Sequence, residues 1–285
     1  MKQLIVVADD FGLTKSVNEG IARSYEEGIV TSLNLLPSGE AFDDAVTLAK
    51  RIGLDEAGAH LSLTETLPIS NPDRIRSLIG RDGRLAKGHA QFFLKYLSGV
   101  IRPDEVYTEW KTQMERVIAT GLKITNLSSH EHLHILPGIL DILIRLAMEY
   151  NISAIRYPHA DRSYLKTSPM VIAKKLTLSL AEKHMSGAII SSGLISPDHF
   201  RGFFDSGNIT ENVLLHILSD LKDGTTELVC HPGFLGREVL DRYRFHKNSE
   251  AELFALTSRR VNRVIDEKKI RLVSYAEFLS KTKFQ

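Results

Sequence analysis

The stretch that decides the fold lies near the start of the chain, where residues 4–13 read LIVVADDFGL. Its successive apolar residues are typical of a strand that is buried on both faces of a sheet. Asp9 and Asp10 follow this strand at once, and apolar residues at helical spacing begin after Ser16. A buried strand that leads through a short turn into a helix is the repeating unit of parallel α/β folds.

The same alternation continues to the end of the chain. Apolar runs that predict strands occupy residues 3–8, 30–36, 57–63, 123–128, 152–157, 187–191, 225–230 and 270–273. Amphipathic stretches at 16–27 and 105–120 predict helices, and Ser249 with Glu252 three residues later predicts a capping box on another helix. Seven or eight such units favour a closed (β/α) barrel of parallel strands, and no Gly-x-Gly-x-x-Gly motif follows the first strand.

Composition narrows the class of protein. The 285 residues, 43% of them hydrophobic, are expected to form a single domain around one core. A net charge of +1, with 36 basic and 35 acidic residues interleaved, argues against a nucleic-acid partner. The lone Cys230 excludes an intramolecular disulfide. Because the first apolar run is too short for a signal peptide or a membrane span, we expect a cytoplasmic protein, whose substrate could still be presented at a membrane surface.

One segment interrupts the alternation, at about residues 64–103. It is rich in Gly, Pro and Arg. A long insertion next to a strand end is more often functional than idle in a compact domain. We therefore expect a lid or rim over the site within the single domain 1–285, and a solvated surface excursion is the alternative.

Asp9 and Asp10 are the first candidates for chemistry. Neighbouring side chains on a strand point to opposite faces, but a turn of the backbone at the strand end can bring both carboxylates to one site. One of them is then expected to bind a metal, and the other can take a proton from water. The alternative is that they cap the helix that begins near Thr14–Ser16.

A second candidate is the histidine run at residues 129–134, which read SHEHLH. In an extended strand His130, His132 and His134 share one face, and at a strand end the first one or two are enough to reach a metal. Three histidines on one face are difficult to satisfy without a ligand or a hydrogen-bond network. His60 alone would be unremarkable. It becomes a candidate for the same site because it is a third polar group at the end of an apolar run.

Two further side chains close apolar runs. His231 follows residues 225–230, where it is expected either to act as a general acid for a leaving amine or to bond to a turn. Arg156 could bind a substrate oxygen or pair with a core acid. Cys230 lies inside an apolar run, so we do not expect it to be a nucleophile.

These pieces, taken together, match a known family. The matching stretches are ADDFGL at 8–13, VNEGI at 17–21, GIVTS at 28–32, GAHLSLT at 58–64, SHEHLH at 129–134 and TELVCHPG at 226–233. Their order and their spread over the chain resemble the YdjC-like (ChbG/HpnK) family of carbohydrate deacetylases. The resemblance implies a distorted (β/α) barrel that binds one divalent metal ion.

The resemblance also implies roles for single residues. Asp10, His60 and His130 would be the metal ligands, Asp9 the base, and His231 a catalytic or substrate-facing group. Family substrates are N-acetylated amino sugars, either chitooligosaccharides or N-acetylglucosaminyl lipids of hopanoid biosynthesis. Two positions depart from the pattern of many members: Ser128 stands in place of Asp, and Val7 in place of Asn.

We therefore expect metal-assisted hydrolysis of an amide, with Arg156, His132 and His134 as substrate contacts. Two imidazoles and one carboxylate favour zinc, and magnesium, which prefers oxygen ligands, ranks second. Two rival functions stay open: a phosphoesterase, which would usually need a second metal, and a sugar- or metal-binding barrel without turnover. A homodimer is a further open expectation.

Overall fold

Parallel strands form the centre of the molecule, a computed structural model that describes residues 1–159 and 169–282. Within those residues the strands are β1 (Lys2–Phe11), β2 (Ser32–Leu35), β3 (Glu56–Leu61), β4 (Lys123–Ser129), β5 (Ala154–Ile155), β6 (His199–Arg201), β7 (Gly224–Cys230) and β8 (Arg271–Leu272). They pair in the order β5-β4-β3-β2-β1-β7-β6, with β8 on β1. The predicted α/β barrel of seven or eight parallel strands is thereby confirmed, in the form of a curled half-barrel.

The strand β1 organises the sheet because both of its edges are used along most of its length. One edge pairs with β7, while the other pairs with β8 at Gln3 and Leu4 and with β2 from Val7 onward. The two outer strands of the sheet are β5 and β6. They are linked by a short stretch of chain, because Ile195 forms a bridge to β5 and the nearby residues of β6 pair with β7. The curl brings the carboxyl ends of the strands to one mouth.

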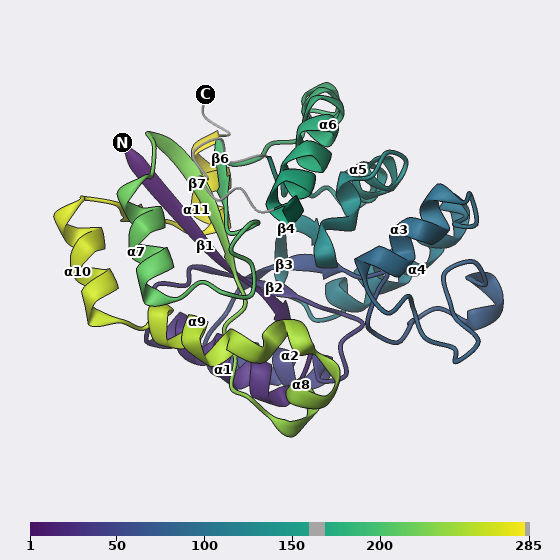
Figure 1. The fold of residues 1–285 in the computed structure, drawn as a ribbon, viewed down its shortest axis with the longest axis horizontal. Coiled ribbons are helices and arrows are strands. Elements are labelled where there is room, and N and C mark those ends of the chain that lie inside the picture. The colour runs from purple at the N-terminus through teal and green to yellow at the C-terminus, as the bar shows by residue number, and fades with distance from the viewer. Residues whose placement is uncertain (160–168, 283–285) are drawn as a thin grey trace.

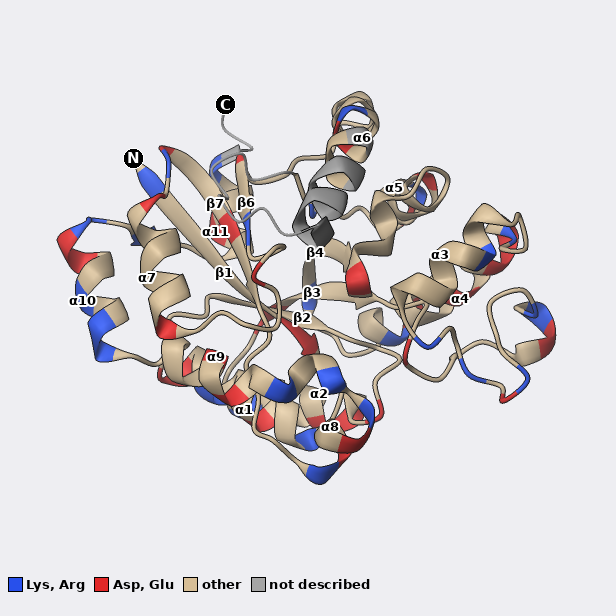
Figure 2. Cartoon of the chain, in the orientation of Figure 1, with Lys and Arg blue, Asp and Glu red and all other residues tan. Residues whose placement is uncertain are grey.

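Helices surround the sheet (Figure 1). They are α1 (Lys15–Glu26), α2 (Phe42–Arg51), α3 (His89–Leu97), α4 (Pro103–Ile118), α5 (Ile139–Glu149), α6 (Pro169–Ser191), α7 (Glu211–Ser219), α8 (Arg237–Arg242), α9 (Ser249–Leu256), α10 (Arg259–Glu267) and α11 (Tyr275–Thr282), with short 3₁₀ turns η1 (Pro72–Arg74), η2 (His130–Ile135) and η3 (Arg244–Asn248). Among the described residues, no helix is long and apolar enough to cross a membrane. Acidic and basic residues are interspersed over the helices, apart from the grey part of α6 (Figure 2).

The two faces of β1 pack against different cores. Leu4 and Val6 belong to the large core beneath the helices. Ile5 and Val7 point the other way, into a small core inside the curl that they share with Tyr275 of α11. Asp9 continues this inward row, since alternate residues of a strand share a face. The interior of the half-barrel is therefore apolar at its base and polar toward its mouth.

Two local predictions are wrong. Residues 187–191 are the end of α6, whereas the strand of this unit is the short β6. A short apolar run does not distinguish a strand from a buried helix by periodicity alone. The capping box is also absent, because Ser249 is the first residue of α9 and its predicted partner Glu252 accepts hydrogen bonds from the backbone N–H groups of Ile209 and His231 instead.

The predicted insertion at 64–103 lies between β3 and α4 and contains η1 and α3 (Figure 1). Two buried carboxylates of α4 hold its first half: Glu109 accepts from the backbone N–H groups of Ile69 and Ser70, and Glu105 from that of Ser77. The insertion also contributes fully or almost fully buried side chains to the large core, namely Ile75, Leu78, Leu85 and Phe92. It is thus anchored to the rest of the domain.

Candidate metal centre

The end of β1 places two adjacent carboxylates at the mouth. The pairing of β1 with β2 shifts register between Ala8 and Phe11, and Asp10 adopts a left-handed conformation with φ 65°. As a result the Nε2 atom of His60 lies 3.7 Å from Asp9 Oδ2 and 3.5 Å from Asp10 Oδ1. The side chain of Thr14 caps the helix that follows. The aspartates therefore do not act as its caps, which was the alternative interpretation.

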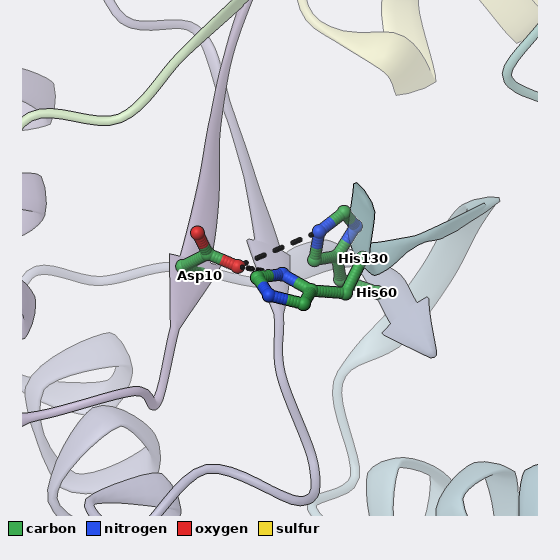
Figure 3. Close-up of side chains that lie close together, drawn as sticks. All are labelled: Asp10, His60 and His130. Carbon is green, nitrogen blue, oxygen red and sulfur yellow. Dashed lines mark hydrogen bonds and ion pairs between the residues drawn. The ribbon is translucent and has the colours of Figure 1, made fainter. Parts of the chain in front are cut away.

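Asp10, His60 and His130 converge from the ends of three strands, β1, β3 and β4 (Figure 3). One ligand atom from each lies within 4.8 Å of the others, and all three side chains are buried. The shortest contact joins His130 Nδ1 to Asp10 Oδ1 at 2.8 Å. One carboxylate and two imidazoles that converge in this way fit a first-row divalent ion with further positions left for water or substrate.

Other side chains hold the outward-facing atoms of these residues. The Nδ1 atom of His60 and the hydroxyl of Ser128, the position where the family often has Asp, are hydrogen-bonded at 2.7 Å. The second oxygen of Asp10 lies 3.1 Å from Nε2 of His246, a fully buried residue of η3. Sequence reasoning missed His246, because it lies on an irregular turn with no strand end or periodicity to mark it.

A different network holds Asp9. The guanidinium of Arg156 donates to both of its oxygens, at 2.5 and 2.9 Å, and Asn34 donates to Oδ1 at 2.7 Å. The remaining nitrogen of the guanidinium, Nε, donates to Glu227 at 2.6 Å. The hydroxyl of Tyr275 donates to the same carboxylate. Arg156 is fully enclosed. The structure therefore pairs it with core acids, the alternative that the sequence left open, and does not support the predicted contact with substrate.

The charges of the site follow from these contacts. Burial opposes ionisation of Asp10, but His130 and His246 outweigh it and hold the pKa of Asp10 well below its usual range. Burial lowers the pKa of His60 to about 4, against the pull of the two aspartates. Burial also opposes the charged form of His130, but Asp10 and Glu65 outweigh it and raise the pKa of His130 well above its usual value. A cation would replace the proton on His130, because metal ligands must be deprotonated.

The three histidines of residues 130–134 do not share a strand face, so that prediction is wrong. The strand β4 ends at Ser129, and Glu131 and His132 then take left-handed conformations with φ 53° and 54°. The chain turns sharply after His130, which alone joins the metal group. The ring of His132 instead packs against Phe200 and Phe203.

His134 ends up deep in the fold. Its Nδ1 atom and the Ser129 hydroxyl are hydrogen-bonded at 2.6 Å, and its Nε2 atom lies 3.2 Å from the carbonyl oxygen of Arg156. The residue has no exposed surface. Both ring nitrogens are engaged, so the geometry does not support the predicted substrate contact and places His134 as a support for the backbone of Arg156.

His231 stands at the end of β7, as its position after the apolar run predicted. Its backbone N–H donates to Glu252 at 2.7 Å, and its ring packs edge-on against Phe245. Its Nδ1 atom is buried and has no partner among the described residues. Burial lowers the pKa of His231, despite the nearby Asp10 and Glu252. The neighbouring Cys230 is fully buried, and this burial raises the pKa of its thiol, as expected for an inert cysteine.

Two glycines allow close approaches that the site requires, one to backbone and one to a side chain. A Cβ atom on Gly20 of α1 would lie 2.4 Å from Cα of Gly233, so glycine lets the loop that carries His231 rest on α1. A Cβ atom on Gly58 would lie 1.8 Å from Oδ1 of Asn34, so glycine there leaves room for the partner of Asp9.

Comparisons with known proteins agree with this geometry. The family model described as YdjC-like protein matches residues 3–267. A carbohydrate deacetylase of Brevibacillus brevis is 33% identical over 276 residues, covering 96% of this chain and 99% of the relative. A carbohydrate deacetylase of Thermoanaerobacter pseudethanolicus is 29% identical over 277 residues, covering 97% and 99%.

A solved structure extends the similarity to the fold. A protein of Enterococcus faecalis V583, provisionally named for cellobiose-phosphate cleavage, superposes with a TM-score of 0.79 at 27% identity, covering 97% of this chain and 98% of that one. The resemblance found in the sequence motifs is confirmed, and the chain belongs to the YdjC-like family.

Proposed function

We propose that this chain is a metal-dependent deacetylase that removes the acetyl group from an N-acetylated amino sugar. The observation that carries the proposal is the convergence of Asp10, His60 and His130 at the mouth, beside a second ionised carboxylate, Asp9. The names of the relatives from Brevibacillus brevis and Thermoanaerobacter pseudethanolicus support the reaction and the sugar.

The three converging residues would hold one divalent ion. Such an ion, when bound, polarises the acetyl carbonyl and lowers the pKa of water. Two imidazoles and one carboxylate favour zinc, and magnesium is the second choice because it prefers oxygen ligands. His60 suits the role of ligand because its lowered pKa keeps the ring neutral near pH 7.

Asp9 is the proposed base that takes the proton from the attacking water. Burial alone would raise the pKa of Asp9, but Arg156 and His60 outweigh it and hold this pKa well below its usual range. The carboxylate therefore stays ionised, and its two bonds to Arg156 fix its direction. A low pKa weakens a base, so its effect depends on position and on the acidity that the ion gives to water.

His231 is the proposed acid that protonates the departing sugar amine. Its buried Nδ1 atom has no partner among the described residues, so no other group occupies this nitrogen. The lowered pKa of His231 makes its charged form a stronger acid, although fewer molecules carry that proton near pH 7.

His132 is the proposed substrate contact that the geometry supports best. Its half-buried ring is packed between Phe200 and Phe203, with centroid distances of 5.7 and 5.2 Å, and its Nδ1 atom lacks a partner in the described structure. Apolar walls with a few polar atoms are typical of small-molecule sites.

We include chitooligosaccharides and N-acetylglucosaminyl glycolipids, hopanoid-linked ones among them, as substrates. A cytoplasmic location and a homodimer stay predictions from the sequence.

Nothing specific favours the rival functions. A two-metal phosphoesterase would need a second cluster of ligands, and the described residues bring together one such group. A barrel that only binds sugar or metal would show no turnover and would not need Asp9 as a base.

The test is an acetate-release assay with N-acetylglucosamine, diacetylchitobiose and an N-acetylglucosaminyl lipid. We expect turnover of at least one substrate, loss of turnover with a chelator, and recovery when zinc is added. Acetate release that persists after the metal is stripped would contradict the metal centre. Zinc binding without acetate release from any N-acetylated sugar would contradict the deacetylase and favour the binding protein.

A further inference from the structure

The two histidines of the metal group differ in their outer partners. His60 turns its second nitrogen to a neutral hydroxyl, that of Ser128. His130 turns its Nε2 atom to the carboxylate of Glu65, at 3.1 Å. Since Nδ1 of His130 faces Asp10, Nε2 is the nitrogen that remains to donate a proton to Glu65. A carboxylate behind a ligating imidazole fixes the tautomer and direction of the ring and raises its basicity.

Glu65 holds this position at a cost to the backbone. Its φ is 61°, a left-handed backbone conformation that residues other than Gly, Asn and Asp rarely adopt. The surroundings enforce it: the N–H of Glu65 donates to the carbonyl of Ala86 at 2.7 Å, and Arg84 donates to the carbonyl of Glu65. Thr64 also bridges to Ala86. Residues 84–86 of the insertion therefore hold in place the residue that touches His130.

We propose that Glu65 is a positioning residue for His130, and that through it the insertion at 64–103 sets the affinity of the metal centre. The inference rests on the proposed metal site and adds to it a residue outside the converging group of Asp10, His60 and His130. It assigns to the insertion an effect on the metal, besides any effect on the choice of substrate.

The chain offers a matched control in Glu131. This residue is also left-handed, with φ 53°, and its carboxylate is similarly covered, with 18% of the side chain exposed against 24% for Glu65. Its hydrogen-bond partner is Nδ1 of His89, at 2.7 Å. The charge of His130 also lowers the pKa of Glu131, but no hydrogen bond joins the two side chains. Loss of charge at Glu131 thus removes a negative charge near His130 and leaves the hydrogen bond between His130 Nε2 and Glu65 in place.

The experiment measures zinc affinity by chelator competition without substrate, for wild type, Glu65→Gln, Glu65→Ala, Glu65→Gly and Glu131→Gln. We expect zinc to bind about 10–100-fold more weakly to Glu65→Ala and Glu65→Gly. Glu65→Gln, which keeps an amide oxygen as acceptor, should lie between them and wild type. Glu131→Gln should stay within about threefold of wild type.

Glu65→Gly separates positioning from folding. Glycine accepts a φ of 61° without strain, which offsets the loss of the contact with His130, so the metal-free variant should unfold close to the wild-type temperature while it binds zinc more weakly. Zinc affinity within about threefold of wild type for Glu65→Ala and Glu65→Gly would overturn the inference and leave the metal centre intact. A wild-type chain that binds no zinc would overturn the metal centre together with the inference.

Discussion

Asp9 and Asp10 are adjacent in sequence, of the same type and equally buried, yet they belong to different regions of the site. Asp10 is surrounded by imidazoles, those of His130 and His246. Asp9 is held by the guanidinium of Arg156. An imidazole gives up its proton when a cation approaches, whereas a guanidinium stays charged at any ordinary pH. The comparison teaches that the partner, and not the carboxylate, decides which aspartate is free to bind a metal.

The backbone makes this division of roles available. In a regular strand the two side chains would point to opposite faces. The left-handed Asp10, where β1 shifts register against β2, turns the second carboxylate toward His60 as well. Such a conformation costs about 1–3 kcal/mol and persists where the surroundings enforce it. Substitution of each aspartate in turn therefore tests the comparison directly.

The largest effect is expected for Asp10→Asn. Asparagine tolerates the left-handed conformation but lacks the negative charge that balances a cation. Zinc affinity should fall by more than the roughly 10–100-fold that is typical for loss of an outer partner, and turnover should be lost with the metal. Zinc titration and acetate release measure the two effects. Wild-type zinc affinity in this variant would show that Asp10 is not a ligand.

Asp9→Asn should show the opposite pattern. The amide keeps the shape of the side chain and one acceptor for Arg156, but it cannot take a proton from water. Turnover should fall about 10²–10⁴-fold, the usual contribution of a general base, while zinc content stays the same. The measurements are kcat on the best substrate and zinc content after gel filtration.

The exposed Asp73 of η1 provides the control for this substitution, since Asp73→Asn should change neither quantity. If Asp9→Asn instead loses zinc, the two aspartates share the ligand role, and the contrast between their regions fails. If it turns over substrate at the wild-type rate, the base lies elsewhere.

Much of this site could be predicted because parallel strands end at one edge. Asp10, His60 and His130 each follow or close an apolar run, so their convergence follows once those runs are assigned to one sheet. The same rule located His231 at the end of β7. To place these residues together it is enough that the strands are parallel in one sheet, which the alternation of strand and helix indicates.

The rest depends on geometry that the sequence does not signal. The left-handed turn at Glu131 and His132 contains no Gly or Asn, so no turn residue in the sequence indicates that His132 and His134 point away from the face of His130. Glu65 and His246 lie on irregular segments brought to the site by tertiary contacts alone. Such residues follow from the packing of the whole domain, which no local pattern encodes.

The smallest effect concerns His134, which supports the backbone of Arg156, and it appears as a pH dependence of the free energy of unfolding. Burial and the nearby Arg156 lower the pKa of His134 to about 3, against about 6.5 in the unfolded chain. Between these values the unfolded chain binds the extra proton, so the free energy of unfolding falls as the pH is lowered through this window. From about pH 7 to about pH 5 this one residue should remove about 2 kcal/mol.

His134→Gln removes the titrating ring and should therefore shrink this loss. Urea unfolding of metal-free protein at the two pH values should give a drop in free energy about 2 kcal/mol smaller for His134→Gln than for wild type. The exposed His216 of α7 is the control, and His216→Gln should leave the drop unchanged. Equal drops in wild type and His134→Gln would mean that folded His134 takes up a proton between about pH 7 and about pH 5 as readily as the unfolded chain does, so that burial does not lower its pKa.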